Sequence, residues 1–112
     1  MKFGYLGLAL ALAACAHHRA SRVPQFTASS ITPKGAVSEC LMRELSTLPV
    51  AVVRTQGGAK DAISVRFDQA IATELEVSQA GSGTVTAVYA DRGPWPYSEQ
   101  VNASVRGCSE RP

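Results

Sequence analysis

The strongest constraint on the fold is a period-two alternation of apolar and polar side chains in the second half of the chain. Ile63, Val65 and Phe67 alternate with Ser64 and Arg66. Three further stretches alternate in the same way: Ile71–Val77, Val85–Tyr89 and Val101–Val105. Alternation of this kind is typical of strands with one buried and one solvated face. Together with the short β-branched stretch 50–56, it predicts an antiparallel sheet of four or five strands.

One of these segments is ambiguous. Residues 68–80 could form a helix, with Asp68 as N-cap and Gly81 as C-cap. The alternation of aliphatic residues with Glu74 and Glu76 favours a strand instead. The turn residues 80–83 and the alternating residues after them favour a hairpin, so we expect a strand here.

A single amphipathic helix is predicted before the sheet. Thr32 and Pro33 are typical of a helix start, and Pro49 ends the segment. The apolar stripe between them consists of Val37, Leu41, Leu45 and Leu48. The expected fold class is therefore α+β, with one N-terminal amphipathic helix packed on a four- or five-stranded antiparallel sheet, in a domain that spans residues 32–112.

The first fifteen residues have the layout of an export signal. Lys2 supplies a positive charge, and residues 3–12 form an apolar run that is too short to span a bilayer. The run ends in Leu12-Ala13-Ala14-Cys15. This motif resembles the lipobox of bacterial lipoproteins.

The lipobox resemblance covers residues 1–15 and implies a processing route. It implies a diacylglyceryl thioether on Cys15, cleavage that removes residues 1–14, and acylation of the new amino terminus. Because Ala rather than Asp stands at position 16, the usual sorting rule implies anchoring at the periplasmic face of the outer membrane. The alternative is an ordinary secretory signal that is cleaved after an alanine, with Cys15 incidental.

Residues 15–31 are interpreted as the lipidated cysteine and a flexible tether. Residues 16–31 show neither the helix nor the strand period, and they are rich in Ser, Ala and basic residues. His17 and His18 could suggest a metal site, but adjacent side chains point apart in an extended chain. We expect no metal and no cofactor.

Cys40 and Cys108 remain after lipidation, and an even pair in an exported chain predicts a disulfide. The bond would join the helix to the C-terminal strand. The alternative, a redox pair, lacks a C-x-x-C motif, so the structural interpretation is preferred.

The sequence contains no recognisable catalytic set. Both histidines lie in the tether, which removes imidazole chemistry from the domain, and no nucleotide-binding motif occurs. Glu74 and Glu76 could form a carboxylate pair, but they also fit a solvated sheet face. The formal net charge of +2 argues against a nucleic-acid partner. We expect no catalytic residues.

The segment 91–97 is the most distinctive loop, because it carries the only tryptophan of the chain, Trp95, together with Tyr97. Exposed aromatic residues on a proline-stiffened loop would form a binding site. The alternative, which we favour, is that Trp95 caps the open end of the core.

Three functions are compatible with these features. The preferred one is a non-catalytic binding or assembly module of the cell envelope, attached to the membrane through Cys15 and paired with an envelope protein. The second is a small-ligand-binding or inhibitor domain, and the third, least favoured, is an enzyme. A concave apolar pocket would favour the second over the first.

Overall fold

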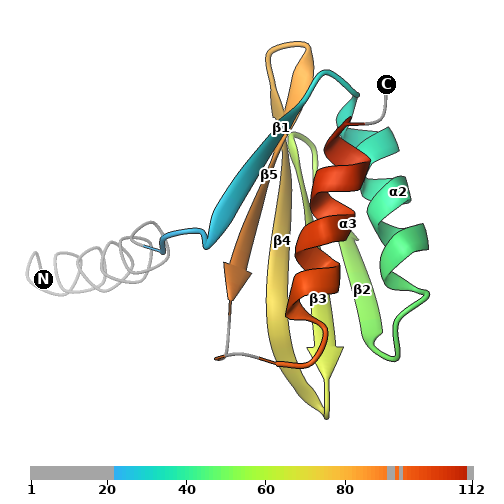
Figure 1. Ribbon diagram of the computed structural model, residues 1–112. Helices are drawn as coiled ribbons and strands as arrows, with labels where there is room; N and C mark the ends of the chain where they lie inside the picture. Colours follow the sequence, from blue (N-terminus) through green and yellow to red (C-terminus); the bar gives the residue numbers. More distant parts are fainter. Residues whose placement is uncertain (1–21, 91–92, 94, 111–112) are drawn as a thin grey trace, which may run out of the picture.

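A five-stranded antiparallel sheet carries two helices on one of its faces (Figure 1). The computed structural model describes residues 22–90, 93 and 95–110. In chain order the elements are β1 (Phe26–Ser30), α2 (Lys34–Leu45), β2 (Ala51–Gln56), β3 (Lys60–Phe67), β4 (Ala70–Ala80), β5 (Gly83–Ala90) and α3 (Ser98–Glu110).

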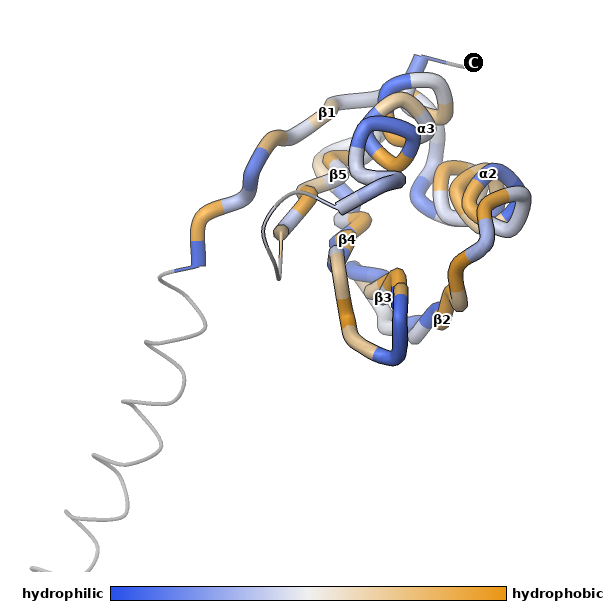
Figure 2. Tube along the Cα trace, turned by 60° about the horizontal axis from the view of Figure 1, so that its bottom comes forward, coloured by the Kyte–Doolittle hydropathy of each residue, from blue (hydrophilic) through white to orange (hydrophobic). Residues whose placement is uncertain are grey.

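The strand order is β1-β5-β4-β3-β2, so the first two strands of the chain form the two edges of the sheet. Helix α2 takes the chain from one edge to the other, and the strands from β2 to β5 then return as a meander. Helix α3 packs on β1 and β5, beside α2. Figure 2 shows both helices on the same side of the curved sheet. The opposite face, which we call the outer sheet face, has no helix over it among the described residues.

The predicted fold class of a single N-terminal helix packed on a sheet is wrong. Among the described residues the first element is a strand, and there are two short helices rather than one. The segment around Val101 and Val105, predicted as a strand, belongs to α3. Val101, Val105 and Cys108 are spaced four and three residues apart, so one helix face buries all three. An alternation over only five residues is compatible with the strand period and with the helix period. The packing of this segment over β1 and β5 selects the helix.

Strand β1, and not the C-terminal segment, completes the five-stranded sheet. Its residues 26–30 lie inside the predicted tether and pair with β5 along their whole length. The prediction of a tether that extends to residue 31 is therefore wrong for this stretch. In this strand Phe26 and Ala28 face the helices, while Thr27 and Ser29 face away. Because most of its side chains are small, the alternation is too weak in the sequence to predict a strand. Cys15 and residues 16–21 lie outside the described residues.

The hairpin over residues 70–90 is confirmed, but the inward faces of its strands differ from the expected ones. Ala80 pairs with Gly83 across a two-residue turn, in which Gly81 has a φ of 62°. This register turns Thr84, Thr86 and Val88 inward and places the expected set 85, 87 and 89 on the outer sheet face.

A second deviation lies at the start of β4. The register between β3 and β4 shifts after Val65, which leaves Ala72 without a direct partner. This bulge reverses the facing of the residues before it. Ile71 is therefore 39% exposed, whereas Leu75 and Val77 are buried as predicted.

The core lies between the sheet and the two helices. Helix α2 contributes Val37, Leu41 and Leu45, three members of the predicted stripe. The disulfide between Cys40 and Cys108 is confirmed, with 5.7 Å between the two Cα atoms. It joins α2 to α3 rather than to a strand. Because it closes a loop of 68 residues, the chain-entropy model assigns it about 4 kcal/mol of stabilisation.

Candidate functional site

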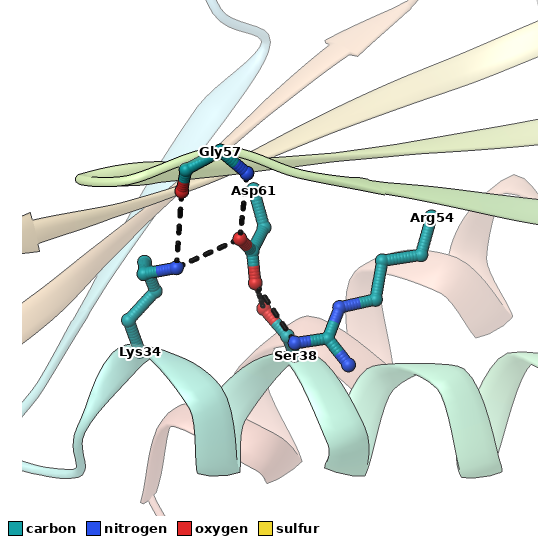
Figure 3. A network of polar contacts seen from close by, with 5 residues as sticks. All are labelled: Lys34, Ser38, Arg54, Gly57 and Asp61. Carbon is teal, nitrogen blue, oxygen red and sulfur yellow. Dashed lines mark hydrogen bonds and ion pairs between the residues drawn. The ribbon is translucent and has the colours of Figure 1, made fainter.

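The most concentrated polar chemistry in the domain surrounds a buried carboxylate, Asp61, near the start of β3. Its side chain is fully buried and faces the helices. Four groups converge on it: Lys34 and Ser38 from the first turns of α2, Arg54 from β2, and the backbone of Gly57 from the following loop (Figure 3). We call these five residues the Asp61 cluster.

Both carboxylate oxygens of Asp61 accept hydrogen bonds. The Nζ atom of Lys34 donates to Oδ1 at 2.7 Å, and the backbone N–H of Gly57 donates to the same oxygen at 3.4 Å. The Oγ atom of Ser38 donates to Oδ2 at 2.8 Å, and Nη2 of Arg54 donates to Oδ2 at 3.0 Å. The lysine also donates to the carbonyl oxygen of Gly57 at 3.4 Å, so it bridges the helix and the loop.

The cluster keeps Asp61 ionised. Burial alone would raise the pKa of this carboxyl, because it disfavours the charged form. The hydrogen bonds from Lys34, Ser38, Arg54 and Gly57 outweigh burial and lower the pKa from 3.8 to about 2. A carboxylate in this state is a poor general acid or base at neutral pH, where an effective catalytic pKa lies near the working pH. The arrangement fixes the end of β2 against α2 instead.

The sequence pattern itself contains a sign of this cluster. Asp61 is two residues before Ile63 and four before Val65, so it shares the inward face of the predicted strand. A charged residue at an inward strand position requires a partner. The partners could not be identified, since Lys34 and Ser38 lie more than twenty positions away in the chain.

Glu74 and Glu76, the possible carboxylate pair of the sequence, lie on the outer sheet face. Glu74 accepts a hydrogen bond at 2.9 Å from Arg22, and Oε2 of Glu76 lies 3.5 Å from Nζ of Lys60. The hydroxyl of Tyr89 donates to Glu76 at 3.3 Å. Burial and the charge of Glu76 raise the pKa of Tyr89. Each glutamate therefore has its own cationic partner, as expected of a solvated sheet face.

Trp95 belongs to the core, and the predicted binding loop is not presented to solvent at this residue. Its side chain is 7% exposed, and its ring centroid lies 5.6 Å from that of Phe67 and 6.2 Å from that of Tyr97. These three rings close one end of the core, which agrees with the core-capping alternative. Tyr97 is half-buried. Asp91, Arg92 and Pro94 lie outside the described residues.

Two hollows on the described surface are wide open to solvent. The larger one, of about 760 Å³, is lined by residues 49–51 together with Arg66, Asp68 and Gln69. Asp68 and Gln69 form the β3–β4 turn, with positive φ values of 54° and 65°. The smaller one is lined by Glu39, Met42, Arg43 and Ser46 of the α2 region. Neither is the enclosed apolar pocket that would favour a small-ligand site.

Neither a cluster of metal ligands nor a membrane-spanning helix occurs in the part of the chain that the structure describes. There, no three residues of the types His, Cys, Asp and Glu gather closely enough to hold a metal ion. Neither of the two described helices has the length and hydropathy that crossing a bilayer requires.

Comparison with protein-family models, with characterised proteins and with solved structures found no match to this chain. The assignment of function therefore depends on the residues themselves.

Proposed function

We propose that this protein is a membrane-anchored bacterial lipoprotein whose small extracytoplasmic domain is a non-catalytic binding or assembly module of the cell envelope. The motif Leu12-Ala13-Ala14-Cys15 is the observation that carries the anchor. Lipid on Cys15 would attach the domain to the membrane, since several acyl chains together bind firmly. The alanine at position 16 supports the periplasmic face of the outer membrane as the location.

The disulfide supports an extracytoplasmic location independently of the lipobox. Disulfides such as Cys40–Cys108 persist in oxidising compartments and are rare in the cytosol. A domain of this size has a small core, so a covalent link between its two helices stabilises a fold that would otherwise be marginal.

The position of the first described residues indicates how the domain would sit on its anchor. Arg22 contacts two residues of the outer sheet face: it pairs with Glu74, and its guanidinium lies 4.6 Å from the ring centroid of Tyr89. Only seven residue steps separate Cys15 from Arg22, which span at most about 25 Å. The outer sheet face would therefore be held near the membrane.

Binding is favoured over catalysis by the state of the carboxylates. Asp61 is enclosed by its four partners, and Glu74 and Glu76 are paired with surface cations. The outer sheet face and the sheet edge at β2 are, by contrast, open to solvent in the described chain.

The anchor is tested by intact mass spectrometry of the protein isolated from a bacterial envelope, with the variant Cys15→Ala as control. The expected result is a mature chain that begins at Cys15 and carries acyl chains, together with release of the variant from the membrane fraction. A mature chain without lipid would contradict the proposed anchor.

The binding role is tested by photo-crosslinking in the envelope from two exposed positions. One crosslinker replaces Ala62 on the outer sheet face, and the matched control replaces Glu99 on α3, in the helix layer. We expect an abundant protein adduct from position 62 and little from position 99. Equal, weak labelling from both positions would contradict a binding role of the sheet.

A further inference from the structure

Strand β2 is an edge strand that the molecule leaves open. It pairs with β3 on one side, and no described strand pairs with its other side. Val53, in its centre, is 53% exposed and lies on the outer sheet face. An exposed edge strand with β-branched side chains and no proline readily pairs with another strand. The inward charge of Arg54 does not prevent such pairing, because Asp61 neutralises it within the same chain.

On the side of β2 that faces the helices, the surface next to this edge is also apolar. Between β2 and α2 lies a row of partly buried hydrophobic side chains, which we call the edge seam: Met42, Leu48, Val50 and Val52. Each packs on the core but keeps part of its surface in solvent. A second element placed along the edge would bury this surface, which favours association.

We propose that β2 pairs antiparallel with β2 of a second copy of this chain, about a two-fold axis at Val53, to form a homodimer with a continuous ten-stranded sheet. The sequence of β2 is self-complementary in this register. Val53 lies opposite Val53 of the second copy, Ala51 opposite Thr55, and Val52 opposite Arg54. Opposed β-branched residues stabilise a ladder, whereas a register centred on Arg54 would oppose two like charges.

Helix α2 is placed to contribute to the same interface. Ser38 has a short side chain and contacts Asp61, which pairs with Gln56 in the ladder between β2 and β3, so Ser38 lies near the level of Gln56. One helical turn further, about 6 Å along α2, stands Met42, and the same distance along β2 is about two residues, at Arg54, next to Val53. Met42 therefore lies close to the level of the two-fold axis.

The proposed symmetry is also compatible with two membrane anchors, a point that depends on the function proposed above. A two-fold axis between antiparallel edge strands is perpendicular to the sheet, so both outer sheet faces lie on the same side of the dimer. Arg22, the first described residue, is on that face through its contacts with Glu74 and Tyr89. Both tethers would thus leave toward one membrane.

Cysteine crosslinking of the full chain in the bacterial envelope tests the register. In the proposed dimer the Cα atoms of the two copies of residue 53 are about 4.5–5.5 Å apart, within reach of a disulfide. The two copies of residue 55 are about 13 Å apart. Mild oxidation is expected to convert most of the Val53→Cys variant into a disulfide-linked dimer of twice the mass, and to leave Thr55→Cys and the unsubstituted chain monomeric.

Two other outcomes would overturn the proposal. No more dimer from Val53→Cys than from Thr55→Cys would exclude this register. A mixed disulfide between Val53→Cys and a different protein would assign the edge to a heterologous strand rather than to a second copy.

Sedimentation of the chain in detergent gives a second measurement that does not depend on where the protein is anchored. Val53→Lys would place two ammonium groups opposite each other, so we expect the dimer dissociation constant to rise at least about tenfold. Because Val53 is half-exposed, the variant should fold, which circular dichroism would verify. An unsubstituted chain that sediments as a monomer at all concentrations would overturn the dimer even if Cys15 carries lipid.

Discussion

The two edges of the sheet are built in different ways. At the β1 edge, hydrogen bonds between uncharged groups hold the chain next to β1: the N–H of Gln25 donates to the carbonyl of Val88 at 2.6 Å, and the hydroxyl of Thr84 donates to the carbonyl of Thr32 at 2.6 Å. Helix α3 packs on this edge, and the guanidinium of Arg106 lies 5.1 Å from the ring centroid of Phe26. At the β2 edge, the charges of the Asp61 cluster fix one end, and the edge seam stays partly exposed.

This difference indicates that α3 and β5 hold β1 mainly by packing and hydrogen bonds, while buried charges hold one end of β2 and the edge seam keeps apolar surface exposed. A substitution at one edge should therefore leave the opening of the other edge unchanged.

The largest effect is expected from Asp61→Ala. This substitution leaves Lys34 and Arg54 largely buried without their counter-charge, which typically costs about 3–5 kcal/mol. The measurement is the free energy of unfolding in urea, with hydrogen exchange of β2 and β1 as the local readout.

Glu74→Ala is the matched control, because it removes an exposed ion pair worth less than about 1 kcal/mol. If Asp61→Ala lowers the free energy of unfolding no more than this control does, the distinction between the edges is wrong. It is also wrong if hydrogen exchange in β1 rises as much as in β2.

An acid-dependent loss of stability is expected from the same residue. The pKa of Asp61 is about 2 in the folded chain, below the ordinary value of 3.8, so the unfolded chain binds more protons in this range. The stabilisation, about 2 kcal/mol from this difference, is fully present above pH 4 and is lost as the pH falls from about 4 to about 2.

Urea unfolding at a series of pH values measures this dependence. In the variant Asp61→Asn, the free energy of unfolding should depend less steeply on pH, because the contribution of the Asp61 cluster is removed. An identical slope in the variant would show that other carboxylates cause the acid sensitivity.

At the β1 edge, Gly83→Ala is expected to destabilise by about 1–2 kcal/mol. A Cβ atom at this position would clash with the carbonyl oxygen of Ser30, so β1 would have to move. Gly58→Ala is the matched control, because an added Cβ there meets no atom within 4 Å. Thermal unfolding compares the stabilities of the two variants. Hydrogen exchange should show faster opening of β1 than of β2 in Gly83→Ala and not in Gly58→Ala.

The smallest effect is expected from Arg106→Ala, which removes the cation–π contact with Phe26. Such contacts contribute about 0.5–1 kcal/mol at exposed sites. The expected result is slightly faster exchange in β1 with no change in β2. A loss of stability larger than that of Gly83→Ala would mean that Arg106 stabilises this edge through more than its contact with Phe26.

Several features could be predicted from local sequence because they depend on neighbouring residues. The hairpin of β4 and β5 follows from its alternation and from Gly81, which adopts the left-handed conformation that the turn requires. The stripe of Val37, Leu41 and Leu45 predicted a helix over most of the observed α2. The disulfide followed from cysteine count and the export signal.

The candidate sites were less predictable. The sequence alone is compatible with Trp95 as a binding residue or as a cap of the core. Its contact with Phe67, 28 positions earlier, places it in the core. The Asp61 cluster joins two strands and a helix, so no local motif describes it.

The sequence by itself determined the meander of strands, the first helix and the pairing of the cysteines, since period, turn residues and thiol count are local or compositional properties. Tertiary structure alone decided three further points. It made the segment around Val105 a helix, it placed Phe26–Ser30 at the sheet edge, and it turned Thr84 and Thr86 inward. The physical reason is that short segments of mixed period have nearly equal local preferences, so burial against the rest of the chain selects between them.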